Sequence, residues 1–157
     1  MMTAGVHRQD GEGLRNAILQ IVPLLDEADP AWCIYGSMAL VLNGVAGMEA
    51  HDVDILMSAD GVHRLMQRLP QARLLTDDKP DGRFRSLHAR IYIKGVEVDV
   101  SGDLLVRQAE EWQAVHVHTV CQRQGIRYAS LPDCIRLLRQ FARPKDLLRL
   151  EQLGSVE

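Results

Sequence analysis

The sequence predicts a mixed α/β fold of the α+β kind, in which helices flank a mixed β-sheet and a pair of helices closes the chain. Segments with apolar residues every three or four positions, typical of helices, alternate with segments in which every second residue is apolar, typical of strands. Two of the latter flank Lys94-Gly95, a pair typical of a β-hairpin turn. The chain has 157 residues, enough for one domain with a substantial core. We therefore expect a single domain over residues 1–157, with 1–10 as a loose leader.

Breaking and capping residues divide the first half of the chain into its elements. Asp29-Pro30 ends an amphipathic helix, and Asn43-Gly44 ends a shorter one for which Ser37 is a suitable N-cap. The expected elements are a helix at 11–27, a strand at 32–35, a helix at 37–42, a strand at 52–57 and a helix at 59–69.

The second half of the chain is expected to contain two hairpins and the closing pair of helices. A segment rich in Asp, Lys, Pro and Gly precedes the first hairpin and is typical of a loop. Gly125 marks the turn of the second hairpin. The expected elements are a loop at 76–83, strands on both sides of Lys94-Gly95, a helix at 103–112, strands on both sides of Gly125, and helices at 131–141 and 144–153.

Composition and charge argue against several classes of protein. The net charge of −3 disfavours a protein held broadly on nucleic acid by charge alone. The three cysteines are isolated, which indicates neither a disulfide framework nor a zinc ribbon, and His116 and His118 lack an evident third ligand for zinc. No apolar run approaches the roughly 20 residues that span a bilayer, and no signal-peptide pattern opens the chain. We expect a cytoplasmic protein without a membrane partner.

Asp52 and Asp54 are the first candidate site residues. They stand two positions apart in an expected strand, so their side chains share one face. Two adjacent carboxylates repel each other, and a divalent cation between them would remove that cost. Mg²⁺ is typically bound by one or two carboxylates together with water and substrate phosphates. The pair therefore predicts a Mg²⁺ or Mn²⁺ site, whereas the alternative is an edge strand with solvated acids.

A third carboxylate, Asp99, lies in the strand after the first hairpin turn, within the sequence VEVDV. Glu97 and Ser101 share its face by parity, although Glu97 is interpreted as an exposed hairpin residue. If this strand lies beside the strand of Asp52, Asp99 completes a triad of acids. Two metal ions about 3.5–4 Å apart, bridged by such acids, can hold the attacking and leaving oxygens of a phosphoryl displacement.

Gly36 and Ser37 stand where the short expected strand at 32–35 meets the following helix. Glycine lets the backbone approach a ligand closely, and a helix N-terminus offers N–H groups to a phosphate. The serine hydroxyl can add a hydrogen bond. The alternative is an ordinary N-cap after a strand. A phosphate cradle combined with a metal-binding carboxylate pair predicts nucleoside-triphosphate chemistry, which neither feature alone would indicate.

Taken together, these residues resemble a family signature. The order GS, HDVDIL and VEVDV is similar to the signature of the DNA polymerase β-like nucleotidyltransferase superfamily. The segment GIRYASLPDCIRLLRQFARPKDLLRLEQL resembles the closing strand and two helices of its small bacterial antibiotic-modifying and abortive-infection-type members. The resemblance extends over about residues 32–153 and implies a nucleotidyltransferase fold.

The resemblance also implies a role for each candidate residue. Asp52 and Asp54 would hold Mg²⁺ and the triphosphate, and Asp99 would bind a second metal ion or act as the general base. Gly36 and Ser37 would contact the β and γ phosphates. Two further phosphate-binding residues are implied on the closing helices. They are Arg139, which stands with Arg136 on the helix where relatives commonly have a lysine, and Lys145, in the motif Arg143-Pro144-Lys145-Asp146. For Lys145, the alternative is a role in an ordinary helix start, which explains the neighbouring Pro144 and Asp146 but not the lysine.

The implied reaction moves a nucleoside monophosphate from a nucleoside triphosphate onto a hydroxyl of a small molecule, RNA or protein and releases pyrophosphate. An aminoglycoside-like or lincosamide-like acceptor is one interpretation, and a homodimer is one arrangement that could complete the acceptor site. Glu49, in the sequence MEAH before Asp52, stands where relatives often carry Arg and Thr. The alternatives are a catalytically weak binding module of the same fold, for example a toxin–antitoxin component, and a metal-dependent phosphodiesterase.

Overall fold

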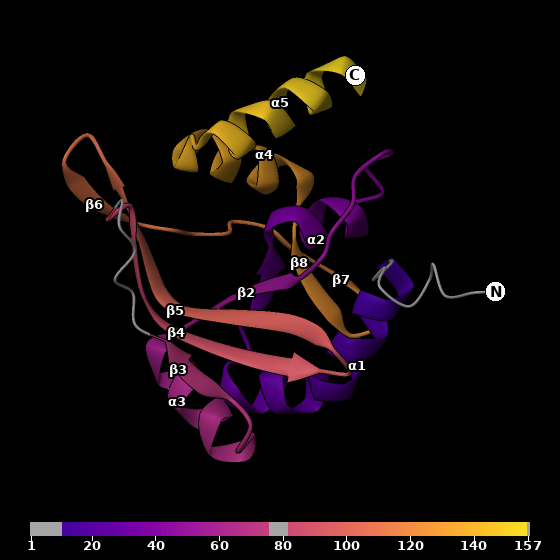
Figure 1. Ribbon diagram of the computed structural model, residues 1–157, viewed down its shortest axis with the longest axis vertical. Coiled ribbons are helices and arrows are strands. Elements are labelled where there is room, and N and C mark those ends of the chain that lie inside the picture. The colour runs from indigo at the N-terminus through magenta and orange to yellow at the C-terminus, as the bar shows by residue number, and fades with distance from the viewer. Residues whose placement is uncertain (1–10, 76–81, 157) are drawn as a thin grey trace.

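The computed structural model, drawn in Figure 1, describes residues 11–75 and 82–156. The expected leader at 1–10 and most of the expected loop at 76–83 therefore lie outside the described residues. In chain order the elements are α1 (Gly11–Ala28), β1 (Cys33–Tyr35), α2 (Gly36–Leu42), β2 (Val53–Met57), α3 (Ala59–Arg68), β3 (Arg73–Leu75), β4 (Phe84–Ile93), β5 (Val96–Gln108), β6 (Glu111–Ala114), β7 (Val120–Arg123), β8 (Ile126–Ala129), α4 (Leu131–Phe141) and α5 (Pro144–Val156).

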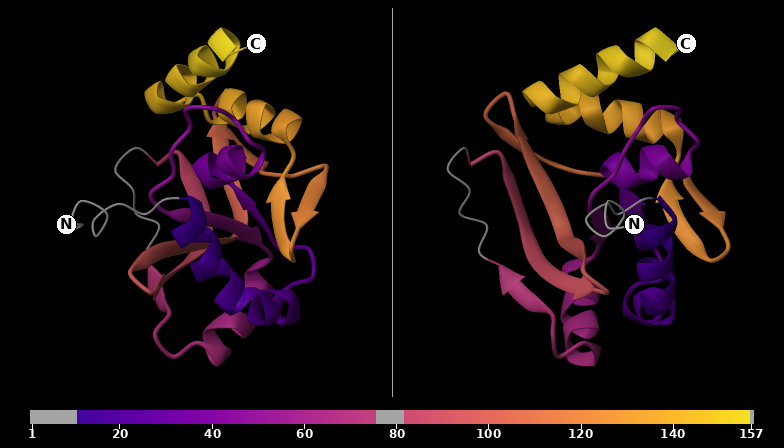
Figure 2. Two further views of the ribbon diagram at one scale, coloured as in Figure 1. Left: turned by 90° about the vertical axis from the view of Figure 1, so that its right-hand side faces the viewer. Right: turned by 45° about the vertical axis from the view of Figure 1, so that its right-hand side comes forward.

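The strands form one mixed sheet in the order β3-β4-β5-β2-β1-β8-β7, with β6 paired to β5. The pairs β1–β8 and β2–β5 are parallel, whereas the other strand pairs are antiparallel. Figures 1 and 2 show α4 and α5 on one side of the sheet and α3 on the opposite side with α1. The fold is therefore the mixed α/β arrangement predicted from the sequence, including its closing pair of helices. Among the described helices, none combines the length and apolar character that crossing a bilayer requires.

Apolar side chains divide between the two faces of the sheet. Ile34 and Ile55 belong to a large buried cluster that also contains the inner residues of α1 and α3. Cys33 and Leu56, their immediate neighbours in sequence, belong instead to a smaller cluster with Phe141 of α4. Successive residues of a strand point to opposite faces, so the central strands are covered on both sides.

The same alternation along β5 determines which side chains face the closing helices. The valines of the VEVDV sequence are at most 1% exposed and lie in the cluster with α1 and α3. Glu97 and Asp99 therefore project from the other face, as the parity of the sequence predicted. The turn before β5 also agrees with the sequence, because Lys94 and Gly95 have φ values of 50° and 79°, typical of a type I′ hairpin turn.

One expected helix, at 103–112, is a strand in the structure. β5 continues through this stretch to Gln108, and Ala109 and Glu110 then form the turn into β6 with φ values of 51° and 67°. Leu104 and Val106 are 7% and 0% exposed, which is the alternation of a strand rather than of a helix. The prediction was wrong because pairing with β4 on one side and β6 on the other decides the conformation, and local preference does not show such partners.

The expected capping role of Ser37 is also corrected. α2 begins one residue earlier, at Gly36, and its N-cap position is Tyr35, without a side-chain cap. Gly36 has a φ of 74°, so the chain turns sharply at the glycine before Ser37 is reached. Ser37 is instead only 7% exposed and lies at the candidate site described below.

Asp133, at the start of α4, ties this helix to the segment that precedes β7. Its carboxylate accepts hydrogen bonds from four groups and is 4% exposed. The donors are His118 N at 3.1 Å, Thr119 N at 2.8 Å, Ser130 Oγ at 2.9 Å and Arg136 Nη2 at 2.7 Å. Burial alone would raise the pKa of Asp133, but these bonds outweigh it and lower the pKa to about 2.

We expect Asp133→Ala to lower the free energy of unfolding by about 2–4 kcal/mol, because it leaves buried backbone donors without an acceptor. Since the folded pKa lies below the unfolded value of 3.8, the contribution of Asp133 is present above about pH 4 and is lost as the pH falls toward 2. Urea unfolding at about pH 7 measures the loss. Glu111→Gln, which changes an exposed carboxylate, is expected to stay within about 0.5 kcal/mol of wild type. Equal effects of the two substitutions would contradict this role.

Candidate active site

The candidate site lies where β2 and β5 pair in parallel. In this register Asp54 stands opposite Asp99, so the strand adjacency on which an acidic triad depends is present. Tyr35 of β1 lies opposite Asp54 on its other side, and Arg90 of β4 lies opposite Asp99. Asp52 directly precedes β2. Four neighbouring strands thus bring residues from distant parts of the sequence to one place on the sheet.

A cavity of about 300 Å³ lies at this place, with walls from the sheet, α2, α4 and α5. Its volume is at the lower end of the roughly 300–1,000 Å³ typical of small-molecule sites. Apolar side chains of the wall include Tyr35, Phe84, Leu104, Leu137 and Phe141. Of the residues that the sequence assigned to the site, all except Arg139 line the cavity, namely Gly36, Ser37, Asp52, Asp54, Asp99 and Lys145.

Gly36 brings the backbone against Asp54. A Cβ atom at Gly36 would lie 3.2 Å from Asp54 Oδ2, which is tighter than ordinary van der Waals contact. The residue also has a φ of 74°, a conformation that side-chain-bearing residues rarely adopt. Both observations explain why a glycine stands here, and the first places its backbone beside the Asp54 carboxylate.

Asp54 has an unfavourable environment for a negative charge. Burial raises the pKa of Asp54 to about 7, and the neighbouring Asp52 and Asp99 carboxylates contribute to the same shift. Lys145 and Arg143 of the closing helices act in the opposite direction. The arrangement is therefore one that a bound cation would stabilise.

The raised pKa of Asp54 predicts that the metal-free protein becomes more stable as the pH falls from about 7.5 to about 5.5. Unfolded Asp54 ionises near 3.8 and folded Asp54 near 7, so the folded state binds the extra proton in this window. The contribution is fully present below the unfolded pKa and is lost as the pH rises through the folded pKa, on the order of 2 kcal/mol between the two conditions. Urea unfolding in EDTA measures it, and Asp54→Asn should remove this part of the pH dependence. An unchanged pH dependence in the variant would contradict the assignment.

Asp99 differs from Asp54 because two basic side chains already contact its carboxylate. Arg90 Nε donates to Asp99 Oδ1 at 2.7 Å, and His88 Nε2 lies 3.2 Å from the same oxygen. Burial would raise the pKa of Asp99, but the hydrogen bonds from His88 and Arg90 outweigh it and lower the pKa to about 2. Asp99 is therefore ionised at neutral pH and is held in place by two side chains of β4.

Glu97 belongs to the site, contrary to its interpretation as an exposed hairpin residue. Its side chain is 30% exposed and lines the cavity. One carboxylate oxygen each of Asp52, Glu97 and Asp99 lies within 4.8 Å of the others, a spacing that could hold a metal ion. The alternation along β5 predicted correctly that Glu97 shares a face with Asp99. The sequence did not predict that Glu97 also lies close to Asp52.

Arg143 is a site residue that the sequence did not single out as a ligand contact. Its guanidinium binds Asp146 through Nε at 2.6 Å and Nη2 at 3.1 Å, and it stacks 5.0 Å above the centre of the Phe84 ring. Asp146 is 1% exposed. The motif therefore starts α5 and also fixes the Arg143 side chain through an ion pair with a buried carboxylate. Arg143, Lys145 and Arg149 line the cavity opposite the carboxylates. Lys145 forms no ion pair with a described residue.

The implied place of Arg139 in the site is corrected by the structure. α4 turns Leu137, Leu138 and Phe141 toward the cavity, and Arg139 lies on a different face of the helix. Arg139 lines a separate depression, together with the exposed His116 and others. The phase of the helix explains the difference, since positions 137, 138 and 141 are one helical stripe and position 139 is outside it.

Residues 17–129 match the model of the aminoglycoside-2''-adenylyltransferase family. This match covers most of the chain, and the protein belongs to that family. The fold and the family together define a small protein of the nucleotidyltransferase class. No curated protein sequence matches the chain significantly.

Solved structures are similar to this chain at low sequence identity. A Thermotoga maritima protein that is inferred to be a nucleotidyltransferase is 18% identical, with a TM-score of 0.63 and coverage of 92% of this chain and 96% of its own. JHP933 from Helicobacter pylori is 16% identical, with a TM-score of 0.49 and coverage of 92% and 66%. The first of these supports the fold alone.

Proposed function

We propose that the protein transfers a nucleoside monophosphate from a nucleoside triphosphate to a hydroxyl group of a small molecule. The hydroxyl oxygen forms a bond to the α-phosphorus, the bond from that phosphorus to the β-phosphate bridging oxygen breaks, and pyrophosphate leaves. The observation that carries the proposal is the parallel pairing of β2 and β5, which brings Asp54 beside Asp99 in the cavity shared with Gly36 and the α5 cations. Family membership supports the same class of reaction.

The acidic residues fit a divalent metal ion. Asp52 and Asp54 offer carboxylate oxygens, the ligands that Mg²⁺ and Mn²⁺ prefer, and the pKa of Asp54 is raised by burial and by the neighbouring Asp52 and Asp99 carboxylates. These two residues would hold the ion, which when bound neutralises triphosphate charge and stabilises the charge that develops in the transition state. Glu97 also lies close to Asp52 and Asp99, but Arg90 Nη2 is 3.4 Å from Glu97 Oε2, so we leave Glu97 out of this ligand set.

Arg143, directly before α5, and Lys145, in the first turn of α5, support binding of the triphosphate. Arg143 is preorganised by Asp146 and Phe84, and a fixed guanidinium suits bidentate contact with phosphate oxygens. Lys145 lines the same cavity as Asp54, so it is placed to contact a phosphate bound there through the metal ion. The backbone at Gly36 and the hydroxyl of Ser37 complete the proposed contacts. α2 has seven residues, so we assign the main attraction for phosphate to these side chains rather than to the helix dipole.

Asp99 is proposed to orient the acceptor hydroxyl and to receive its proton. A carboxylate whose pKa is about 2 is a weak base, so the proton moves as the new oxygen–phosphorus bond forms and the hydroxyl becomes acidic. Arg90 and His88 hold the carboxylate in position for this role. The acceptor class that the family description suggests, a hydroxyl-rich and cationic aminoglycoside-like molecule, would also be attracted by Glu97 at the cavity wall.

The proposal is tested by incubating the protein with each labelled nucleoside triphosphate, Mg²⁺ or Mn²⁺, and a panel of aminoglycosides, lincosamides, RNA ends and protein acceptors. Pyrophosphate release together with a mass increase of one nucleoside monophosphate on one acceptor is the expected result. The Asp52→Asn/Asp54→Asn variant is the control and should release none. Binding of nucleotide without pyrophosphate release for any acceptor would overturn the proposal and favour a binding module of the same fold.

A further inference from the structure

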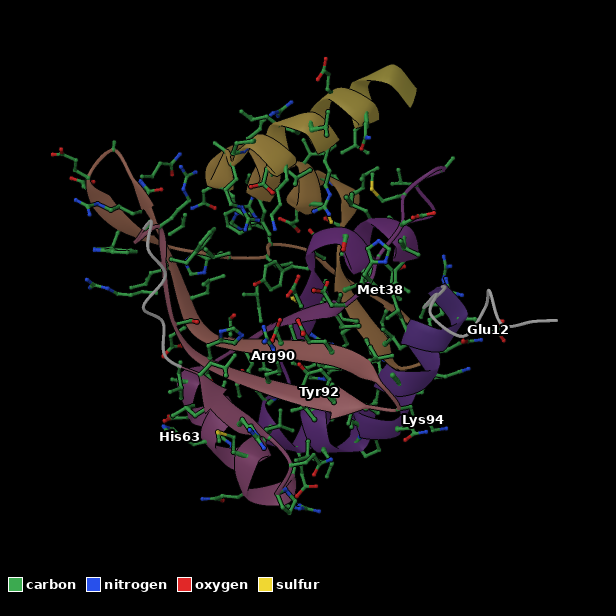
Figure 3. All side chains as sticks on the ribbon, in the orientation of Figure 1. Glu12, Met38, His63, Arg90, Tyr92 and Lys94 are labelled. Atoms are coloured by element: carbon green, nitrogen blue, oxygen red, sulfur yellow. The ribbon has the colours of Figure 1, made fainter. Side chains whose placement is uncertain are left out.

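Arg90 places a positive charge inside the acidic cluster of the site. Its Nε lies 2.7 Å from Asp99 Oδ1, and its Nη2 lies 3.4 Å from both Asp99 Oδ2 and Glu97 Oε2. One side chain therefore contacts three of the four carboxylate oxygens that Glu97 and Asp99 provide. Figure 3 labels Arg90 and Tyr92 two residues apart on β4, near the middle of the sheet.

The position of Arg90 is fixed by the register of the β4–β5 hairpin. The turn at Lys94-Gly95 pairs Tyr92 with Glu97 and Arg90 with Asp99, so these side chains are direct cross-strand neighbours. Tyr92 Oη lies 3.3 Å from Glu97 Oε1 and holds the remaining oxygen of that carboxylate. Arg90 is 33% exposed in its side chain and Asp99 only 12%, so the pair is partly shielded from water.

We propose that Arg90 is a resident cation that takes the place of a second metal ion, so that the protein binds a single divalent ion with its nucleotide, at Asp52 and Asp54. This inference rests on the proposed function and makes it more specific. A second ion about 3.5–4 Å from the first would need oxygens of Asp99 or Glu97, which Arg90 already contacts. It would also lie against a guanidinium that stays charged at every accessible pH, and like charges at such short range repel strongly.

The acidic residues then have separate roles. Asp52 and Asp54 are left for the metal and the triphosphate, whereas Asp99, already neutralised by Arg90, remains an acceptor for the substrate hydroxyl. Arg90 is thus a positioning residue that acts through Asp99 and Glu97. Its removal would free both carboxylates, which together with an oxygen of Asp52 have a spacing that could hold a second ion.

Counting Mn²⁺ ions tests the inference without any need for turnover. Mn²⁺ bound per chain is measured by electron paramagnetic resonance and equilibrium dialysis, with saturating α,β-methylene analogue of the tightest-binding nucleoside triphosphate. We expect one ion for wild type, two for Arg90→Gln, and one for Arg90→Lys, which keeps the charge. Arg85→Gln is the matched control and should bind one, because Arg85 is exposed on the same strand and stacks 4.3 Å from the Trp112 ring centre. Arg90→Gln/Glu97→Gln should return to one ion.

The possible counts separate this inference from the proposed function. Two ions in wild type would overturn the role of Arg90 and leave the proposed function standing. One ion in both wild type and Arg90→Gln would overturn it as well. No bound ion in wild type would overturn both proposals. The wild-type count does not depend on any variant, and circular dichroism verifies that Arg90→Gln is folded before its ions are counted.

Discussion

Replacing Asp54 by asparagine is expected to lower nucleotidyl transfer by about 10³-fold or more while the fold is kept. A neutral amide cannot replace the carboxylate as a metal ligand, and a bound metal contributes several kcal/mol to the transition state. The fold is retained because the charge of Asp54 is itself unfavourable, buried beside Asp52 and Asp99. Steady-state pyrophosphate release with the acceptor found in the screen measures the loss, and urea unfolding verifies that the variant is folded.

The matched control for this experiment is Asp103→Asn. Asp103 is an exposed carboxylate on β5 that lines a different cavity, and its φ of 52° is one that asparagine adopts readily. Turnover of this variant should stay within about twofold of wild type, since surface substitutions away from a site have small effects. If Asp54→Asn kept more than about one tenth of wild-type turnover, Asp54 would not be a ligand of the catalytic metal.

Replacing Gly36 by alanine is expected to weaken binding of the metal–nucleotide complex by about 10–100-fold, the range seen when groups beside a metal ligand are changed. The added Cβ would lie 3.2 Å from Asp54 Oδ2 and would push the carboxylate away from its position. The left-handed backbone conformation adds strain of roughly 1–2 kcal/mol. Calorimetry with a non-hydrolysable nucleotide analogue and Mg²⁺ measures the affinity and needs no acceptor.

Gly44→Ala separates the two effects. Gly44 has a φ of 79°, close to that of Gly36, but a Cβ there would meet nothing within 4 Å. Both substitutions therefore strain the backbone to a similar extent, and only Gly36→Ala disturbs a carboxylate. Unchanged affinity in Gly44→Ala and reduced affinity in Gly36→Ala is the expected pattern. Equal losses in both would mean that the contact between Gly36 and Asp54 has no part in nucleotide binding.

Local periodicity was sufficient to predict the faces on which the acidic residues lie. Asp52 and Asp54 are two positions apart, as are Glu97 and Asp99, and the alternating apolar residues of the same strands are buried. What local periodicity does not contain is the parallel pairing of β2 and β5, which joins residues more than forty positions apart. The resemblance to a known family supplied that neighbour relation in advance.

The partners of Asp99 could have been predicted from the hairpin alone. A two-residue turn at Lys94-Gly95 fixes the register of both strands, and counting back from the turn places Arg90 opposite Asp99. By contrast, the positions of Arg139 and Arg143 relative to the site could not have been predicted from the local sequence. Arg139 lies within α4 and Arg143 directly precedes α5, and only the fold shows that Arg143 lines the cavity with the carboxylates whereas Arg139 does not.

At 103–112 the local preference of the residues for a helix does not decide the conformation. Helix-favouring residues occur there, yet β4 and β6 pair with both edges of β5 and extend it as a strand. The same is true of Ser37 on a smaller scale, because the sharp turn at Gly36 decides where α2 begins. In both places the conformation depends on neighbours that are distant in sequence or on a single backbone angle.

The most direct test of the metal–triphosphate site is calorimetry of a non-hydrolysable nucleoside-triphosphate analogue, with analogues of each base tried in turn. Wild type is expected to bind in the presence of Mg²⁺ and to lose that binding in EDTA, because Asp52 and Asp54 would otherwise face the triphosphate as unscreened like charges. The Asp52→Asn/Asp54→Asn variant should lose the Mg²⁺ dependence and most of the affinity. Equal affinity of wild type and the double variant for the Mg²⁺–nucleotide complex would contradict the assignment of the site.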